Sequence, residues 1–262
     1  MSFNLDSITK GSGIRPPRII LLGVEKIGKS TFASCSESPI FLPIKGEEGI
    51  DALDVLHFPT CNSLDNVLEA LYSIWSGDHL YGTVVIDSAS ALEPLVWART
   101  CRENSNADSI EKVNGGYGKG YTEALYRWRL VTDALDALRK DKNMASIIIG
   151  HVKVKRFDDP AGDSYDQYQF DIHDKASSLL YRWADVILFC NRKVVVKEEK
   201  LGFHKDNVRK RGIDMFDGAR FLYTQKRPAH PGGGRGVFGQ LPYELSLSWQ
   251  AFMEAVSAAS QT

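Results

Sequence analysis

The sequence predicts an α/β fold in which a mostly parallel sheet is covered by helices on both of its faces. Short apolar segments alternate along the chain with longer segments whose apolar residues recur at helical spacing. The chain has 262 residues, 43% of them hydrophobic, which is enough for one domain with a sizeable core. No internal repeat or long low-complexity linker divides it. We therefore expect a single domain over residues 1–262, with its core at about 15–256.

The predicted strands are short apolar segments, several of which end in glycine or in a carboxylate. The first reads RIILLG, and the third reads TVVID and is rich in β-branched residues. Because helices separate most of these strands, parallel pairing is expected, and the loops that bind ligands should collect at the carboxyl ends of the strands. In chain order, the six predicted strands are 18–23, 39–44, 83–87, 145–150, 185–190 and 220–224.

The predicted helices carry apolar residues three and four positions apart, as Leu64, Val67 and Leu71 illustrate within 63–76. Polar and glycine-rich segments between the regular elements are predicted loops, and the charged segment 192–215 is a predicted peripheral hairpin or excursion. The predicted helices are 29–35, 63–76, 92–101, 122–139, 175–183 and 248–259. The predicted loops are 103–120, 153–173 and 228–236.

Composition and charge argue against several functional classes. The net charge is −1, so the chain has no global basic field, and any contact with nucleic acid must come from local basic segments. The four cysteines form no C-x-x-C pair, which argues against a zinc site or a disulfide framework and fits a reducing cytoplasm. The first residues lack a signal-peptide core, and no apolar run reaches the roughly 18 residues that span a bilayer. We expect a cytoplasmic protein without a membrane partner.

The segment LLGVEKIGKSTFA matches the full pattern of a phosphate-binding loop between a strand and a helix. Gly23 and Gly28 permit a tight turn whose backbone N–H groups point at phosphate oxygens. Lys29 is long enough to reach the β- and γ-phosphates, and the Ser30 hydroxyl suits Mg²⁺. The alternative without a binding function is a strand-to-helix turn with a surface lysine. The predicted nucleotide-binding residues are Gly23, Val24, Glu25, Lys26, Ile27, Gly28, Lys29, Ser30 and Thr31.

Three further polar residues follow predicted strands of the same sheet. Asp87 ends the strand TVVID and would hold Mg²⁺ together with Ser30. Glu47, in the segment KGEEG, would polarise a water molecule against the γ-phosphate. His151 follows the strand ending IIIG, where a side chain is placed to sense the γ-phosphate. The alternatives are a turn-forming aspartate, a solvated acidic turn and a structural histidine.

Several segments together resemble the phage-encoded RecA-like P-loop ATPases. These are AAA-type proteins that are often labelled only as phage nucleotide-binding proteins, and some members are single-strand annealing or recombination proteins. The resemblance extends from about Arg18 to Met253. The segments that carry it are GVEKIGKSTFA, the EEG that follows the second strand, TVVIDSASALE, GGYGKGY, IIIGHVKVKRFDDP, RWADVILF and LPYELSLSW.

The resemblance implies a RecA-like P-loop fold, ATP and Mg²⁺ as cofactors, and a homo-oligomer arranged as a ring or filament. By comparison with RecA, Glu47 looks like the catalytic glutamate, and His151 falls where RecA has a glutamine that links the γ-phosphate to a DNA-binding loop. The family's Lys-Asn-Arg near the last strands reads Gly233-Gly234-Arg235 here. The role of completing a neighbour's ATP site therefore falls to Arg235, with Lys226 and Arg227 as alternatives. The implied catalytic set is Lys29, Glu47, Asp87, His151 and Arg235.

The resemblance also implies single-stranded DNA as a partner, with a phage single-strand-binding protein as a further one. The segments that match the DNA-binding loops of RecA are 103–120 and 152–173. Their basic side chains suit phosphates and their aromatic side chains suit unpaired bases, although several aspartates in the second segment oppose this attraction. The alternative is a solvated lid over the nucleotide. The predicted DNA-binding residues are Lys112, Lys119, Lys153, Lys155 and Arg156.

The expected function is that of an ATP hydrolase, DNA-stimulated in this interpretation, which organises single-stranded DNA for annealing or strand exchange in phage recombination or replication. Its location would then be the cytoplasm of the host cell. Two other classes stay open. One is an ATP-dependent assembly or scaffold protein with weak hydrolysis and a protein partner, which the glycine at position 233 favours. The other is a small-molecule kinase, although no acceptor-binding constellation is apparent in the sequence.

Overall fold

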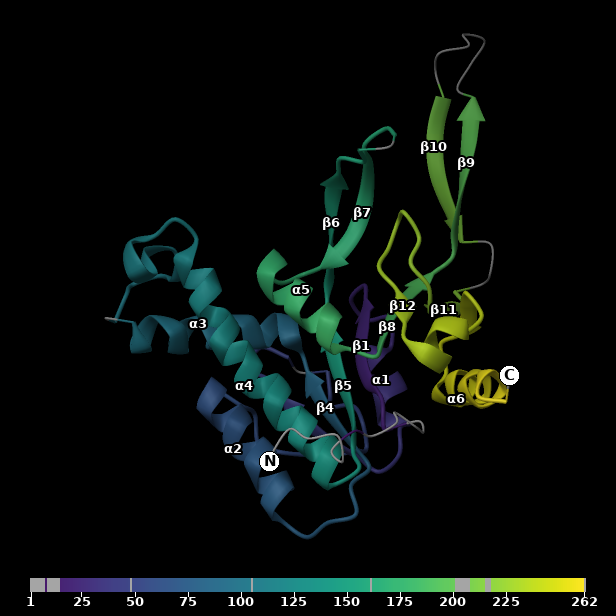
Figure 1. Cartoon of the computed structure of the whole chain (residues 1–262). Coiled ribbons are helices and arrows are strands. Elements are labelled where there is room, and N and C mark those ends of the chain that lie inside the picture. The colour runs from purple at the N-terminus through teal and green to yellow at the C-terminus, as the bar shows by residue number, and fades with distance from the viewer. Residues whose placement is uncertain are drawn as a thin grey trace.

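The structure, a computed structural model, is built around one large sheet (Figure 1). It describes residues 8, 15–47, 49–104, 106–160, 162–200, 208–214 and 218–261. The strand order is β13-β11-β8-β1-β5-β4-β2-β3, and β12 also pairs with β8. These strands are β1 (Arg18–Gly23), β2 (Pro39–Pro43), β3 (Leu56–His57), β4 (Thr83–Asp87), β5 (Ala145–Gly150), β8 (Val186–Arg192), β11 (Arg220–Tyr223), β12 (Gly233–Gly234) and β13 (Glu244–Ser246).

The central strands are parallel, as the sequence predicts. β1 lies between β5 and β8, and β4 lies beyond β5, so β1 and β4 are separated by one strand. β2 and β3 continue the parallel part, whereas β11, β12 and β13 are antiparallel to their neighbours. Because β1, β2, β4 and β5 run in the same direction, the residues that follow them emerge at one edge of the sheet.

Helices cover both faces of the sheet, which confirms the predicted fold class. Alternate residues of β1 point to opposite faces. Ile20 and Leu22 join the cluster that contains α2 to α5, and Ile19 and Leu21 join the cluster that contains α1, α6 and η3. The helices are α1 (Lys29–Ser34), α2 (Leu64–Ser76), α3 (Ala89–Glu103), α4 (Lys119–Asp141), α5 (Asp174–Trp183) and α6 (Trp249–Ala259), and the short 3₁₀ helices are η2 (Ile110–Gly115) and η3 (Gly236–Gln240).

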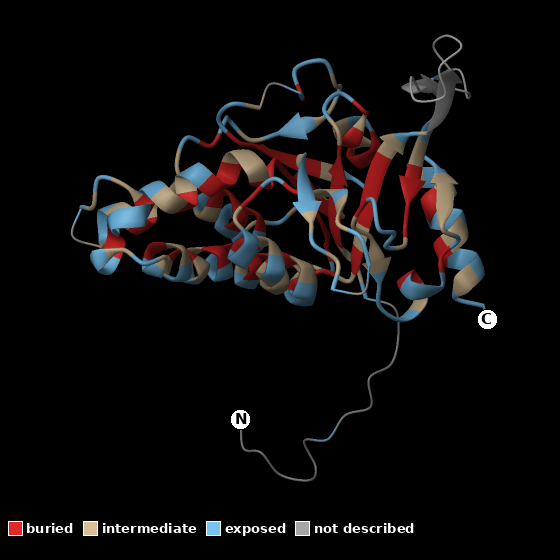
Figure 2. Cartoon of the chain, turned by 90° about the horizontal axis from the view of Figure 1, so that it is seen from above, coloured by how far each residue is buried: buried red, intermediate tan, exposed pale blue. Residues whose placement is uncertain are grey.

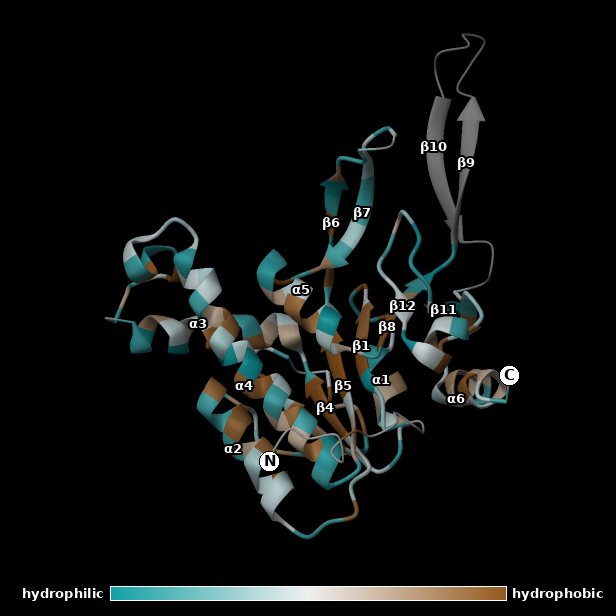
Figure 3. Cartoon of the chain, in the orientation of Figure 1, coloured by the Kyte–Doolittle hydropathy of each residue, from teal (hydrophilic) through white to brown (hydrophobic). Residues whose placement is uncertain are grey.

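The apolar segments read from the sequence become the buried centre of the molecule. The central strands are buried along their length (Figure 2) and are its most hydrophobic part (Figure 3). On the face that α2 to α5 cover, Trp128 of α4 is fully buried in the same cluster as Ile20 and Leu22. Each large apolar side chain buried in this way contributes about 1.5–3 kcal/mol. The sheet is thus a rigid support for the loops at its edge.

The segment 153–173 was predicted as a loop, and this prediction is wrong for most of its length. It contains β6 (Val152–Phe157) and β7 (Tyr165–Phe170), which pair in antiparallel fashion and form a separate two-stranded sheet. β6 is largely exposed, β7 is mostly half-buried, and both are rich in polar residues, so they lack the apolar run that marks the central strands. The alternation of valine and lysine from Val152 to Lys155 was the signal for a strand.

The predicted loop 103–120 is also partly helical. α3 ends at Glu103, η2 occupies Ile110–Gly115, and α4 already begins at Lys119. The start of α3 lies three residues before the predicted position because the Ser88 side chain accepts a hydrogen bond from the N–H of Ala91 and caps the helix.

The charged segment 192–215 contains the predicted hairpin. β9 (Val194–Lys200) and β10 (Val208–Asp214) pair in antiparallel fashion and form a sheet of their own. Across the described residues, no helix has the length and apolar character needed to cross a membrane.

Candidate functional site

The turn between β1 and α1 has the backbone geometry that its glycines predict. Gly28 precedes α1 with a φ of 106°, in the left-handed region that side chains other than glycine rarely adopt. At Gly23, a Cβ atom would lie only 2.6 Å from the carbonyl oxygen of Cys190 on β8. Each glycine is therefore required by the turn itself, one by conformation and the other by close contact with a neighbouring strand.

Lys29 folds back over this turn. Its Nζ donates hydrogen bonds to the carbonyl oxygens of Gly23 (3.0 Å) and Val24 (2.9 Å), and the side chain is buried. Burial lowers the pKa of the ammonium, although Asp87 and Glu47 lie near enough to oppose this effect. A cation held by neutral carbonyl groups in a buried position is prepared to bind an anion such as a phosphate group.

Asp87 meets the first turn of α1. At the end of β4 it is buried, and its Oδ2 accepts a hydrogen bond of 2.6 Å from Ser30 Oγ. Burial raises the pKa of this carboxyl group, and the nearby Glu47 carboxylate raises it further, against the effect of the Ser30 hydroxyl. Two hard oxygen ligands beside an excess of negative charge suit Mg²⁺, which usually takes one or two protein oxygens and keeps several waters. The residues present therefore fit the predicted metal.

One carboxylate oxygen of Glu47 contacts the residues that directly follow β4 and β5. Its Oε1 accepts hydrogen bonds from Ser88 Oγ (2.5 Å) and His151 Nε2 (2.9 Å). Burial alone would raise the pKa of Glu47, but these two hydrogen bonds and the positive charge of Lys29 bring it below the ordinary value. Among the described residues no donor reaches Oε2 of Glu47. The structure thus presents an ionised carboxylate with one oxygen anchored and the other available.

His151 is oriented by this carboxylate. Because an ionised carboxylate only accepts hydrogen bonds, His151 Nε2 is the donor in their contact. The backbone N–H of His151 donates to Ser90 Oγ on α3 (3.1 Å), while its buried Nδ1 has no partner in the described part of the chain. Glu48, the other glutamate of the predicted KGEEG turn, lies outside the described residues.

These side chains line a single cavity of about 690 Å³ at the carboxyl edge of the sheet. Besides the turn residues, it is lined by Glu47, Asp87, His151 and an arginine that the sequence did not predict, Arg220. Arg220 opens β11, and its Nη1 donates to the carbonyl oxygen of Ile27 at 3.1 Å. Only the three-dimensional fold brings it there, since 193 positions separate it from Ile27.

A second cavity of about 350 Å³ adjoins the first. It shares Gly28, Thr31 and Arg220 with the larger cavity and extends to Leu247 and Trp249. The two cavities together offer a charged compartment beside the turn and a more apolar one beside the tail segment LPYELSLSW. Such a pair suits a ligand with a phosphate chain at one end and a ring system at the other.

Arg235, predicted to be catalytic, lies away from this site within the chain. Its backbone N–H donates to the carbonyl oxygen of Asp185, and its guanidinium donates to that of Arg182. Asp185 precedes β8 and pairs with Arg18 at the start of β1, so Arg235 is at the opposite edge of the sheet from Gly23. Arg235 can therefore act only on the site of another copy, and that role stays a prediction.

The predicted DNA-binding residues are spread over three elements, and each already has a polar partner. Lys112 lies in η2, Lys119 begins α4, and the other three residues lie on β6. The contacts are Lys112–Asp108 (2.9 Å), Lys119 Nζ to the Asn114 carbonyl oxygen (3.3 Å), Lys153–Asp171 (3.1 Å), Lys155–Asp174 (3.2 Å) and Arg156–Asp166 (4.0 Å). Exposed ion pairs of this kind contribute only about 0–1 kcal/mol, so phosphate groups could replace the carboxylates.

The chain was compared with protein-family models, with curated proteins and with solved structures. A family model described as an AAA domain matches residues 15–236. No curated protein matches the chain. Among solved structures, the crystal structure of the RadB recombinase aligns with 81% of this chain and 90% of its own, at 14% sequence identity and a TM-score of 0.40.

Proposed function

Because the chain belongs to this AAA-domain family, we propose that it binds ATP with Mg²⁺ in the cavity at the carboxyl edge of the sheet and hydrolyses it there. The observation that carries the proposal is the convergence of Lys29, Ser30, Glu47, Asp87 and His151 on one cavity. In this proposal the triphosphate lies against the turn, and the base and ribose occupy the adjoining cavity beside Trp249.

The roles of the side chains follow from their contacts. Lys29 would exchange its two carbonyl acceptors for phosphate oxygens and stabilise the charge that develops during transfer. Ser30 and Asp87 would hold Mg²⁺, which neutralises charge on the phosphate oxygens when it is bound. Glu47 would orient water and accept its proton at Oε2, while Ser88 and His151 fix the carboxylate through Oε1.

The ATP-bound protein would act on single-stranded DNA, by annealing or strand exchange in phage recombination or replication. The support is the sequence resemblance and the position of the β6–β7 hairpin, which begins directly after His151. The N–H of Asp171 donates to the carbonyl oxygen of His151 (2.9 Å), so both ends of the hairpin are fixed beside the Glu47 carboxylate. In a ring or filament, Arg235 would reach the ATP site of a neighbouring copy.

One observation favours an alternative partner. The three predicted DNA-binding side chains on β6 all have carboxylate partners, which leaves little uncompensated positive charge on the hairpin. An ATP-dependent assembly protein with weak hydrolysis and a protein partner would need no such charge.

Steady-state ATP hydrolysis by the full chain, with and without a single-stranded oligonucleotide at low salt, separates these functions. We expect hydrolysis that the oligonucleotide stimulates and that Lys29→Ala reduces by at least about a hundredfold. Hydrolysis that survives Lys29→Ala would contradict the proposed site. Hydrolysis without any binding of single-stranded DNA at low salt, where phosphate contacts are strongest, would contradict the DNA function and favour the assembly protein.

A further inference from the structure

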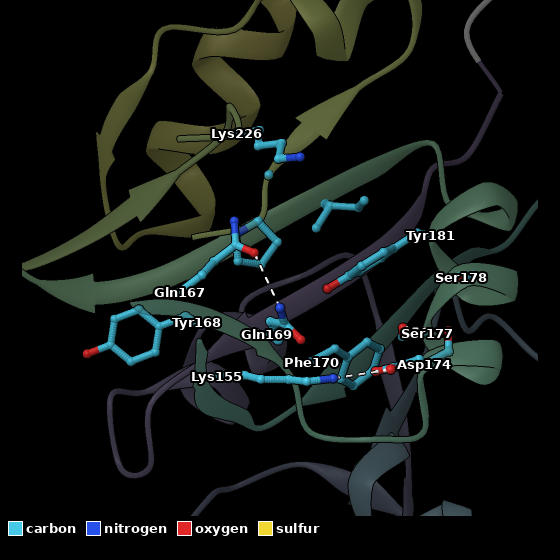
Figure 4. A pocket seen from close by; sticks show the side chains of 13 residues that line it. Lys155, Gln167, Tyr168, Gln169, Phe170, Asp174, Ser177, Ser178, Tyr181 and Lys226 are labelled. Atoms are coloured by element: carbon cyan, nitrogen blue, oxygen red, sulfur yellow. Dashed lines mark hydrogen bonds and ion pairs between the residues drawn. The ribbon is translucent and has the colours of Figure 1, made fainter. Parts of the chain in front are cut away.

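A third cavity, of about 450 Å³, lies beside the β6–β7 hairpin and apart from the proposed ATP cavity (Figure 4). We call it the hairpin pocket. It lies between the hairpin, α5 and the segment 226–232, and its volume is within the range of small-ligand sites. Figure 4 shows Gln167 and Gln169 from β7 on one side and Tyr181 from α5 on the other, with Lys226 at the remaining edge.

The hairpin wall presents amide groups with unused hydrogen-bonding capacity. Gln167 Nε2 donates to the carbonyl oxygen of Pro228 (2.9 Å), which fixes its orientation. Gln169 Nε2 makes a long contact of 3.5 Å with Gln167 Oε1, and no donor among the described residues reaches Gln169 Oε1. A half-buried amide with a free acceptor and a weakly used donor matches the edge of a nucleobase, which carries both kinds of group.

The opposite wall and the floor are aromatic. Phe170 is buried, and its ring centroid lies 5.9 Å from that of Tyr181. Lys226 and Lys155 contribute positive charge at the rim, with Lys155 paired to Asp174 (3.2 Å) and Lys226 without a partner among the described residues. Flat rings, amide edges and rim cations together suit a planar heterocycle that is attached to phosphates.

The floor of the pocket packs against the end of β5, next to a residue of the proposed ATP site. Gly150 precedes His151, and a Cβ at Gly150 would overlap the Phe170 ring, so this ring packs directly on the end of β5. A ligand that rests on Phe170 therefore contacts a side chain packed one residue away from His151.

We propose that the hairpin pocket binds one base of single-stranded DNA. Gln167 and Gln169 contact the edge of the base, its face lies against the aromatic floor, and Lys226 contacts a flanking phosphate. This inference rests on the proposed action on single-stranded DNA and adds the residues and the chemical group that would be recognised. Of the five predicted DNA-binding residues, only Lys155 lines the pocket.

The test is a double-mutant cycle between the protein and the oligonucleotide. The affinity of the full chain, loaded with a non-hydrolysable ATP analogue, is measured by fluorescence anisotropy for an oligothymidylate and for the same strand with abasic sites. We expect Gln169→Ala to weaken binding of the intact strand about threefold to tenfold and to leave binding of the abasic strand within about twofold. Lys226→Ala should weaken both strands alike and lower the salt dependence, because phosphates remain in both.

Two exposed residues outside the pocket provide matched controls, Gln240→Ala in η3 and Lys140→Ala in α4. ATP hydrolysis without DNA should be unchanged in Gln169→Ala, which shows that the fold is intact. Equal losses for the intact and abasic strands, or no loss for either, would overturn the pocket assignment while leaving the DNA function in place. Failure of the wild-type chain to bind either strand would overturn both. If Gln169→Ala instead changed the oligomer mass and left the affinities for the intact and abasic strands at their wild-type values, the pocket would be assigned to a peptide segment of a second copy.

Discussion

A buried carboxyl group, Glu93 on α3, accepts hydrogen bonds from the residue that caps α5, and its replacement has a predictable effect on stability. Glu93 lies on α3 and is only 6% exposed, and both of its oxygens lie 2.9 Å from the backbone N–H of His173, which donates to them. Burial raises the pKa of Glu93 from 4.5 to about 7, despite the hydrogen bond from His173 and the nearby charge of Lys153.

The sign and size of the effect follow from proton linkage. Between pH 4.5 and 7 the folded chain binds more protons at Glu93 than the unfolded chain does, so the free energy of unfolding falls as the pH rises through this window. The pKa of Glu93 is 4.5 in the unfolded chain and about 7 in the folded chain. At 1.36 kcal/mol per pKa unit, this difference lowers the free energy of unfolding by on the order of 3 kcal/mol at pH 8. Glu93→Gln keeps an acceptor for His173 and removes the titration. We therefore expect the variant to match the wild type near pH 4.5 and to exceed its stability at pH 8.

Urea denaturation of both proteins at several pH values between 4.5 and 8 measures this difference. Glu69→Gln, at an exposed position on α2, provides the matched control and should show the pH dependence of the wild type. A Glu93→Gln variant that is no more stable than the wild type at pH 8, or that shows the same slope between pH 4.5 and 7, would refute the assignment of a buried, protonated carboxyl group.

Three further predictions concern the site and the core. Asp87→Asn removes the charge of a proposed Mg²⁺ ligand, and we expect hydrolysis to fall about a hundredfold or more and to require more Mg²⁺, which a Mg²⁺ titration of the rate measures. Arg220→Ala removes the guanidinium beside the phosphate-binding turn, and we expect KM for ATP to rise about tenfold with a smaller change in kcat; an unchanged KM would exclude Arg220 from the site. Trp128→Ala empties a fully buried position and should lower the free energy of unfolding by about 3–5 kcal/mol in urea denaturation, whereas a loss below about 1 kcal/mol would contradict this packing.

The strands and the turn were predictable because local sequence determines them. RIILLG and TVVID are buried on both faces as apolar runs, and the spacing of Gly23 and Gly28 before Lys29 marks the turn in the sequence, although the contact that requires Gly23 is with Cys190 on β8. The carboxyl ends of parallel strands lie at the same edge of a sheet. The sequence therefore predicts that Glu47, Asp87 and His151 belong to one site, and all three line one cavity.

Most of the remaining features depend on tertiary contacts, and the one local signal, the valine–lysine alternation of β6, is short. The β6–β7 hairpin is polar on most of its surface and pairs only with itself, so it resembles a loop in composition. Arg220 reaches Ile27 only because β11 pairs antiparallel to β8, and β8 pairs parallel to β1. Arg235 could be assigned a role by resemblance, but its position at the far edge of the sheet follows only from the fold.

The central claim, that Glu47 activates water at an ATP site formed by this chain, is tested most directly by Glu47→Gln. Nucleotide affinity and the single-turnover rate of ATP hydrolysis are measured on the same preparation. We predict that the variant binds ATP with an affinity within about threefold of the wild type and hydrolyses it at least about a hundredfold more slowly, because the amide keeps the contacts to Ser88 and His151 but accepts no proton. Hydrolysis by Glu47→Gln at the wild-type rate, or a wild-type chain that binds no ATP, would contradict the account.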